Sequence, residues 1–240
     1  MLTKNINFKN FKSKKKNKKI KKDLSNLLIE KNIILKSLSE KYKYNYTRKI
    51  ISKFNKYTNV RVIGMGGSIL GAEAIYDFLK DKIKKNFYFT NNLKPMINSS
   101  YKKEKYLNLI ISKSGNTLET ISNSNIIINN KDKNIFITEN KKSYLYSLAE
   151  SLKAEIVHHN NFIGGRYSVL SEVGMLPAEL MGSNIRNFKQ LNNLVKNKKF
   201  VNGLITSVTN TLYFIKQKKF NSIILNYDES SESLFKWYQQ

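Results

Sequence analysis

The chain has 240 residues, of which 40% are hydrophobic, it contains no cysteine, and its formal net charge at pH 7 is +26. These values describe a globular protein with a sizeable core, and they exclude a disulfide framework and a cysteine-based metal site. No apolar run approaches the ~18 residues of a membrane-spanning helix, and no apolar segment follows the basic N-terminus as it would in a secretory signal. We therefore expect a cytoplasmic protein without a membrane partner.

The excess of positive charge is compatible with a nucleic-acid binder. However, only four of the 43 basic residues are arginine, although arginine is the residue preferred for base edges and bidentate phosphate contacts. Lysine is spread along the whole chain together with many asparagines and isoleucines, which indicates a biased coding composition. We therefore expect no nucleic-acid partner, and a positive field that attracts small anionic substrates.

The predicted elements divide the chain into three parts. Residues 1–45 form a lysine-rich tail followed by a helix, whose apolar spacing continues from Asp23 to about Lys53. Residues 46–185 alternate between strands at 60–65, 87–90, 106–112, 134–138 and 155–158 and helices at 67–80, 117–129 and 143–152. Residues 186–240 are mainly helical up to Gln217 and then contain a strand at 222–226, the expected start of a second α/β domain. This alternation predicts an α/β fold, a doubly wound parallel sheet with helices on both faces.

Residues 112–120 read SKSGNTLET and follow an apolar strand. Ligands of a parallel α/β sheet bind at the carboxyl ends of the strands, which is where Ser112 is expected. Gly115 permits a tight turn, and Thr117 would open the next helix. Hydroxyls, a lysine and the amides of a helix N-terminus together predict a phosphate site. An ordinary N-cap is the simpler alternative for Thr117 taken alone.

Residues 64–71, GMGGSILG, form a second turn of this kind after the first predicted strand. The glycines do not have the G-x-G-x-x-G spacing of a dinucleotide site, and no G-K-[ST] follows as in a nucleotide P-loop. Gly67 permits close backbone approach, and Ser68 lies near the first turn of a helix. Two such turns in one sheet predict a compact cradle for an anionic ligand.

Residues 161–180, NFIGGRYSVLSEVGMLPAEL, form the third segment of interest. Gly164 and Gly165 permit a sharp bend before Arg166, and a helix is expected from about Ser168, with a kink or restart at Pro177. The planar, permanently charged guanidinium of Arg166 suits a developing oxyanion. A structural salt bridge is the alternative.

Together the three segments resemble the glucose-6-phosphate isomerase (phosphoglucose isomerase) family. GGRYSVLSEVG matches the family's G-G-R-[FY]-S signature, SKSGNTLET its sugar-phosphate loop and GMGGSILG its first glycine loop, while the final LFKWYQQ is similar to the segment before its catalytic glutamate. The resemblance covers about residues 60–240. It implies a first SIS-type sugar-phosphate domain over residues 46–185, the start of a second in 186–240, no cofactor, no metal, and a homodimer at full length.

The resemblance also implies roles for individual residues. It assigns the phosphate of the substrate to Ser68, Ser112, Lys113, Ser114 and Thr117, with Gly67 beside the substrate. Arg166 would stabilise an enediolate and Glu119 would orient a catalytic histidine. Gln239 would face the substrate. His158 and His159 do not match the family's histidine motif and are expected to be structural or exposed, and Glu172 is expected to be a carboxylate on a helix face.

The implied reaction is the reversible conversion of glucose 6-phosphate into fructose 6-phosphate through an enediolate. The family's glutamate base, ring-opening histidine and late lysine lie beyond the position matched by Gln240, so we expect a fragment that is inactive alone. Two alternatives stay open. One is a non-catalytic sugar-phosphate-binding SIS module that acts as a regulator, and the other is an isomerase of mannose or amino-sugar phosphates.

Overall fold

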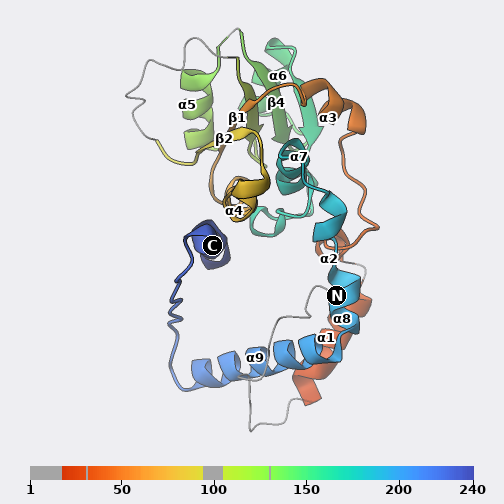
Figure 1. Ribbon diagram of the computed structural model, residues 1–240. Helices are drawn as coiled ribbons and strands as arrows, with labels where there is room; N and C mark the ends of the chain where they lie inside the picture. The colour runs from red at the N-terminus through yellow and green to blue at the C-terminus, as the bar shows by residue number, and fades with distance from the viewer. Residues whose placement is uncertain (1–17, 31, 94–104, 130) are drawn as a thin grey trace. The chain divides into compact units, whose positions relative to one another are not determined.

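The computed structural model describes residues 18–30, 32–93, 105–129 and 131–240 (Figure 1). The chain divides into two compact units. One unit comprises Lys43–Ile185 and Asn226–Gln240, and the other joins residues up to Tyr42 with Arg186–Leu225. The division into residues 1–45, 46–185 and 186–240 stays a prediction. Each unit is described by itself.

The unit that starts at Lys43 is built on a five-stranded parallel sheet with the strand order β2-β1-β3-β4-β5. This confirms the predicted doubly wound α/β fold. Each predicted strand of the sheet is found within one or two residues of its expected ends. The strands are β1 (Asn59–Gly64), β2 (Asn86–Thr90), β3 (Leu107–Ile111), β4 (Lys133–Thr138) and β5 (Glu155–His158).

Helices cover both faces of this sheet because the chain reverses its direction of winding between β1 and β3. Ile63, Ile110 and Phe136, from three adjacent strands, form one core with residues of α5 (Leu118–Ile127) and α6 (Tyr144–Ser151). On the other face, α4 (Leu70–Leu79) packs against α7 (Glu172–Leu180). The helix α7 runs through Pro177 without the restart that the sequence suggested.

The single helix expected from Asp23 to about Lys53 is wrong. The structure has α1 (Lys18–Ile29), α2 (Ile33–Ser37) and α3 (Arg48–Phe54). Asn32 caps α2 by accepting a 2.8 Å hydrogen bond from the Ile34 N–H, and Thr47 is the N-cap of α3. Asparagine favours such a cap over a helix interior, so Asn32 starts a new helix and interrupts the apolar spacing. Thr47 makes no side-chain hydrogen bond to the first turn of α3.

The unit that includes Arg186–Leu225 is helical, and its helix α1 packs against α9 (Lys198–Lys216). It also contains α2, most of the 3-10 turn Ile185–Phe188, and α8 (Leu191–Lys196). The predicted strand at 222–226 is wrong, because these residues form no ladder with any described strand. A strand without a neighbour leaves its backbone groups unpaired, and the side chains of Ile223 and Leu225 are 86% and 73% exposed.

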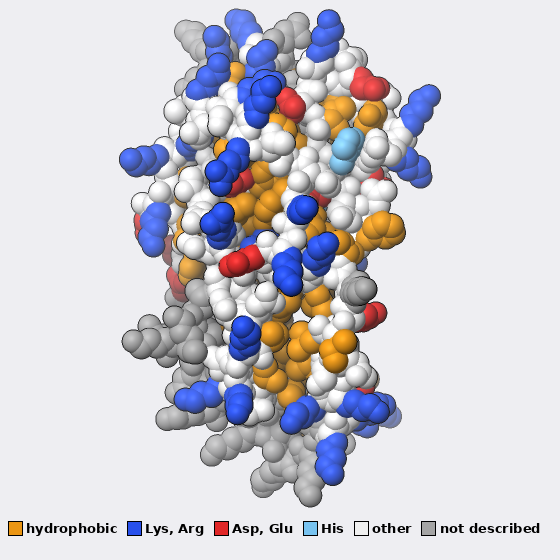
Figure 2. Space-filling model, turned by 90° about the vertical axis from the view of Figure 1, so that its right-hand side faces the viewer, with side chains coloured by type: hydrophobic (Ala, Val, Ile, Leu, Met, Phe, Trp, Pro, Cys, Tyr) orange, Lys and Arg blue, Asp and Glu red, His pale blue; other side chains and the backbone are white. Residues whose placement is uncertain are grey.

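The last helix, α10 (Glu232–Gln239), packs on α4 in the unit with the sheet, where the Ser233 hydroxyl donates to Asp77. Among the residues of this unit that the structure describes, 3-10 turns also occur at Gly66–Ser68, Lys80–Lys82, Gly165–Tyr167 and Glu229–Ser231. Figure 2 shows lysine and arginine side chains scattered over one face of the molecule rather than gathered in a stripe. No helix in the described part of the chain is long and apolar enough to cross a membrane.

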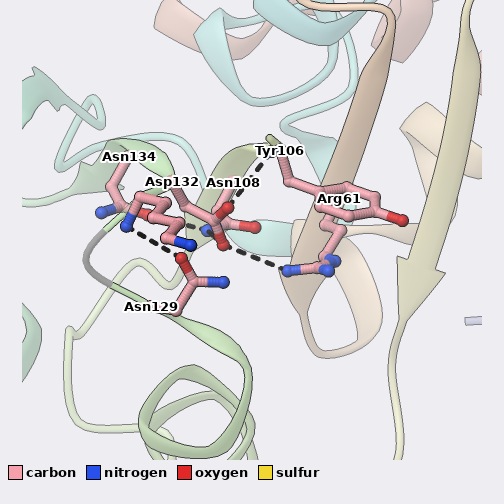
Figure 3. Close-up of polar contacts among 7 residues, drawn as sticks. Arg61, Tyr106, Asn108, Asn129, Asp132 and Asn134 are labelled. Atoms are coloured by element: carbon pink, nitrogen blue, oxygen red, sulfur yellow. Dashed lines mark hydrogen bonds and ion pairs between the residues drawn. The ribbon is translucent and has the colours of Figure 1, made fainter. Parts of the chain in front are cut away.

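A buried polar cluster ties together the amino ends of β1, β3 and β4 (Figure 3). The Asp132 carboxylate accepts from the Arg61 guanidinium at 3.2 Å, from the Asn108 amide at 3.2 Å and from the Tyr106 backbone N–H at 3.1 Å. The Arg61 and Asp132 side chains are 6% and 0% exposed, and the guanidinium lies 3.5 Å from the centre of the Tyr106 ring. Since several donors share one carboxylate, its desolvation is offset by specific hydrogen bonds.

We predict that Asp132→Ala lowers the free energy of unfolding by about 3–5 kcal/mol, because it leaves the Arg61 charge buried without its carboxylate. Urea denaturation measures the loss. Glu232→Ala is the control, because it breaks the exposed Glu232–Lys236 pair and should leave the urea midpoint almost unchanged. Equal shifts in the two variants would contradict the assigned role of the cluster.

Candidate functional site

The candidate site lies at the carboxyl ends of β1 and β3. Gly64 and Ile111 are paired at the ends of these two neighbouring strands, so the loops that follow them start side by side. The strand order reverses at this point, and such a switch point is where doubly wound sheets bind ligands. The fold therefore brings together GMGGSILG and SKSGNTLET, the two turns that the sequence singled out.

The loop after β3 is held in a tight turn by its small residues. Gly115 has φ of +66°, which favours glycine, and a Cβ at this position would overlap the Ser143 hydroxyl. The hydroxyls of Ser112 and Thr117 are 3.0 Å apart, so the two ends of the loop are joined. The Asn116 N–H is 3.2 Å from the Ser114 hydroxyl, which accepts its hydrogen bond.

Thr117 occupies the N-cap position of α5, but its side chain accepts no hydrogen bond from the first turn of that helix. Its hydroxyl is used instead in the contact with Ser112. The first amides of a helix carry partial positive charge and require acceptors. The geometry therefore argues against an ordinary N-cap at Thr117 and supports an anion-binding site at the start of α5.

The loop after β1 contacts the GGRYS segment through backbone atoms, with no side chain between them. A Cβ on Gly67 would overlap the carbonyl group of Gly165 and would lie 2.8 Å from the Arg166 nitrogen. The Ser168 hydroxyl donates to the carbonyl oxygens of Gly165 at 2.7 Å and Gly67 at 3.2 Å. Because neither Gly67 nor Gly165 has a side chain, the backbone that carries Arg166 approaches the loop of Ser68 closely.

Val169 fixes the same region through two further glycines. Val169 lies between α4 and α7. A Cβ on Gly71 of α4 would overlap the Val169 side chain, and a Cβ on Gly174 of α7 would overlap the Val169 carbonyl oxygen. The glycines of both motifs thus allow close packing of the elements that carry them. The sequence indicated glycine loops, but it contained no sign that Val169 and Ser168 join them.

Arg166 is exposed at the edge of these loops, and its Nε donates to the Gln240 backbone carbonyl at 3.0 Å. The Gln240 side chain lies against Gly66, where a Cβ would overlap its amide nitrogen. The structure therefore places Gln240 at the loops, while Gln239 is exposed on α10. The contact of Gln239 with a substrate stays a prediction.

The Lys113 ammonium contacts residues outside the loop that contains it. Its ammonium donates to the Asn161 carbonyl at 2.8 Å and lies 3.4 Å from the Glu139 carboxylate. These contacts join the loop after β3 to the segments after β4 and β5. The direct role in phosphate binding that is expected for Lys113 stays a prediction.

Glu172 and His159 support this arrangement from inside the protein. Glu172 is fully buried, and its carboxylate accepts a 2.7 Å hydrogen bond from the Asn160 N–H. His159 is 2% exposed, and its Nδ1 lies 2.9 Å from the Asn160 carbonyl oxygen. Glu172, in the first turn of α7, is therefore a helix carboxylate that is buried and anchors the segment that receives Lys113. The sequence contained no signal for this pairing, because the partners are backbone atoms.

The other predicted residues flank the same loops. Ser68 ends the 3-10 turn after β1, and Glu119 lies half-buried in the first turn of α5. The described residues contain no group of three or more His, Cys, Asp or Glu side chains that could hold a metal ion. Hydroxyls, backbone amides and Arg166 are the groups that this arrangement offers to a ligand, and they suit an oxyanion such as a phosphate.

The fold and its loops define a doubly wound α/β protein whose candidate ligand site lies at the β1/β3 switch point. The family profile described as phosphoglucose isomerase matches residues 11–240, and the chain belongs to this family. The similarity includes 230 of the 240 residues (from 11 to 240) and so covers both units.

Two relatives illustrate the similarity. The glucose-6-phosphate isomerase of Methanocaldococcus jannaschii is 36% identical over 203 residues, which are 78% of this chain and 50% of the relative. That of Mycoplasmopsis pulmonis is 30% identical over 246 residues, covering 85% of this chain and 55% of the relative. The chain thus spans about half the length of the curated relatives it matches.

The crystal structure of a hypothetical protein from Thermus thermophilus superposes with a TM-score of 0.68 at 19% identity. The superposition covers 91% of this chain and 57% of that one. At this level of identity the likeness shows a shared fold.

We predict that Gly67→Ala disrupts the site, because the new methyl group would overlap the Gly165 carbonyl and force the two loops apart. The expected loss is about 1–3 kcal/mol in the free energy of unfolding, measured by urea denaturation. Gly164→Ala is the control, since its Cβ would be 3.7 Å from the nearest atom and its φ is an ordinary −66°. Similar losses in the two variants would contradict the importance of the contact.

We predict that stability falls as the pH drops below the ordinary histidine pKa of about 6.5, and that His159 contributes to the fall. Burial lowers the pKa of His159, and Lys113 lowers it further, although the Asn160 carbonyl and the carboxylates of Glu172 and Glu139 oppose this shift. The unfolded chain therefore binds a proton more readily than the folded one, so protonation favours unfolding.

The urea midpoint between pH 5 and pH 7.5 checks this prediction. His159→Gln should flatten the slope of the midpoint against pH, whatever its effect on stability at pH 7.5. His158→Gln serves as the control for the loss of a neighbouring histidine. An unchanged slope in His159→Gln would show that other groups cause the acid sensitivity.

Proposed function

We propose that the protein functions as a glucose-6-phosphate isomerase, which interconverts glucose 6-phosphate and fructose 6-phosphate through an enediolate. Its place in metabolism would be glycolysis and gluconeogenesis. The observation that carries the proposal is the contact of the Gly67 loop with the GGRYS segment, at the switch point of the sheet and beside the hydroxyl-rich loop. Membership of the phosphoglucose isomerase family supports it.

In this proposal the phosphate of the sugar binds at the two turns. The hydroxyls of Ser68, Ser112, Ser114 and Thr117 and the first amides of α4 and α5 act as donors. The contact between Ser112 and Thr117 preorganises two of these hydroxyls, so less conformational entropy is lost on binding. Lys113 contributes through the positive field and by holding the loop to Asn161 and Glu139.

In this proposal Arg166 acts at the carbonyl end of the substrate, where the proton is transferred. When the proton next to the carbonyl is removed, negative charge develops on the enediolate oxygens, and a fixed cation stabilises that charge more than the neutral ground state. The backbone of Arg166 is held in place by its close contact with Gly67 and by the hydrogen bond from the Ser168 hydroxyl to the Gly67 carbonyl. Glu119, in the first turn of α5, is the proposed orienting acid. Proton transfer also needs a base, which the family resemblance assigns to a glutamate outside these loops.

Binding of glucose 6-phosphate by isothermal titration calorimetry tests the phosphate site. Ser112→Ala combined with Thr117→Val should weaken binding about tenfold or more, because each lost hydrogen bond to a charged oxygen is worth about 1.5–3 kcal/mol. Ser147→Ala, an exposed serine of α6, is a matched control. Unchanged affinity in the double variant would overturn the assignment of the loop. Binding without formation of fructose 6-phosphate, in protein expressed from the complete gene, would support a regulatory sugar-phosphate module instead.

For Arg166→Ala in protein expressed from the complete gene, we predict a fall in turnover of about 10²–10³, with only a small rise in KM, because its charge acts in the transition state. Initial rates of fructose 6-phosphate formation measure both constants. Arg166→Lys keeps the charge but not the planar fork, so it should recover part of the loss. A loss confined to KM would contradict the enediolate role.

The proposal includes a cytoplasmic location, a homodimer, and no nucleic-acid partner. These features are expected from the family resemblance and from the scattered lysines. A second copy or further chain would also cover apolar residues such as Phe220 and Ile223, which are 71% and 86% exposed.

A further inference from the structure

A second polar cavity lies at the opposite end of the sheet from the candidate site. It has a volume of about 450 Å³ and is open to solvent. Its walls come from the end of α3, the segment before β4, and the turn between α6 and β5. Cavities that bind small molecules fall in the range of ~300–1,000 Å³, so this one has room for a ligand of nucleotide size.

Four lysines line the cavity: Lys53, Lys56, Lys133 and Lys153. Two carboxylates also belong to its walls, and each is already paired. Glu155 lies 2.9 Å from the Lys53 ammonium, and Asp132 is turned inward to Arg61. Among the described residues, no carboxylate lies within ion-pair distance of the amines of Lys56, Lys133 or Lys153. The cavity therefore has a surplus of positive charge that the protein does not neutralise.

This surplus distinguishes the cavity from the rest of the lysine-rich surface. Lysine and arginine side chains are scattered over the face that Figure 2 shows. On a convex surface, such side chains point into water, and solvent separates their charges. Lysines around one hollow share a field that is focused by its low-dielectric walls. Neutral polar side chains, Asn129, Asn134 and Ser151, also line it and can hydrogen-bond the oxygens of an anion.

We propose that this cavity is a binding site for a small molecule that carries a polyphosphate chain. Several adjacent phosphates match several lysines better than one phosphate would, because each ammonium acts as a separate point charge. The half-buried ring of Tyr57 lies in the wall, with the Lys56 ammonium 5.8 Å from its centre. This ring offers a stacking surface if the polyphosphate belongs to a nucleotide. The site does not rest on the isomerase proposal, and it shares no residue with the candidate site.

Calorimetric titration with inorganic tripolyphosphate tests the site, in low salt and with saturating glucose 6-phosphate to occupy the other site. Lys133→Glu combined with Lys153→Glu should weaken binding at least tenfold. Lys80→Glu combined with Lys82→Glu is the matched control, because it changes the net charge equally at an exposed turn outside the cavity. Circular dichroism and the urea midpoint establish that both variants fold.

Equal losses in the two double variants, or no binding by the unaltered protein, would overturn the proposal. A further titration with magnesium-free ATP distinguishes the sources of the polyphosphate. Tighter binding of ATP that is lost in Tyr57→Leu indicates a nucleotide, whereas equal affinities that are insensitive to Tyr57 indicate that only the phosphates are recognised. A double variant with Ser112→Ala and Thr117→Val should leave tripolyphosphate binding unchanged, so failure here and failure of the isomerase proposal are separable.

Discussion

The candidate site depends on one close backbone contact, between Gly67 and the peptide that joins Gly165 to Arg166. The two segments are about 100 residues apart in the chain, and no side chain fits between them. Ser168 reinforces the contact by donating to the carbonyls on both sides of it. Because the contact is made by backbone, the position of the Arg166 peptide relative to the glycine loop does not depend on rotamers, which suits a cation that must be preorganised.

The sheet that presents these loops is fixed at the amino ends of its strands and along its apolar core. At the amino ends, Asp132 joins the Arg61 side chain of β1 to the Asn108 side chain of β3. Along the strands, apolar side chains such as Ile63, Ile110 and Phe136 pack against α5 and α6, and α4 and α7 pack together on the other face. The carboxyl ends are thereby left as the place where loops can carry polar and strained residues, which explains why ligand sites of this fold gather there. The buried Asp132 cluster contributes rigidity at the amino ends of the strands, away from the candidate site.

The sequence predicts the strands of the sheet, but it does not predict the polar contacts around them. Buried parallel strands are short apolar runs, so 106–112 and 134–138 could be recognised from side-chain types alone. The break at Asn32 does not follow from the apolar spacing, because a side-chain cap competes with a spacing that continues past it. The strand at 222–226 was predicted from β-propensity, but strand formation also requires a neighbour. The contacts of Lys113 with the Asn161 carbonyl and Glu139 do not follow from its place in SKSGNTLET, because both partners come from other segments.

The two anion sites that we propose use different physics. At the candidate active site, hydroxyls, helix amides and one arginine bind through short, directed hydrogen bonds, which discriminate shape and depend little on bulk salt. At the lysine-lined cavity, exposed ammonium groups attract the ligand chiefly through their charge, which salt screens over about 10 Å at 0.1 M. A chain with 43 basic residues can form cavities of the second kind without special selection. It can form the first kind only where glycines, serines and a backbone contact coincide, as they do at Gly67, Ser112 and Arg166, so the candidate site is the stronger indication of function.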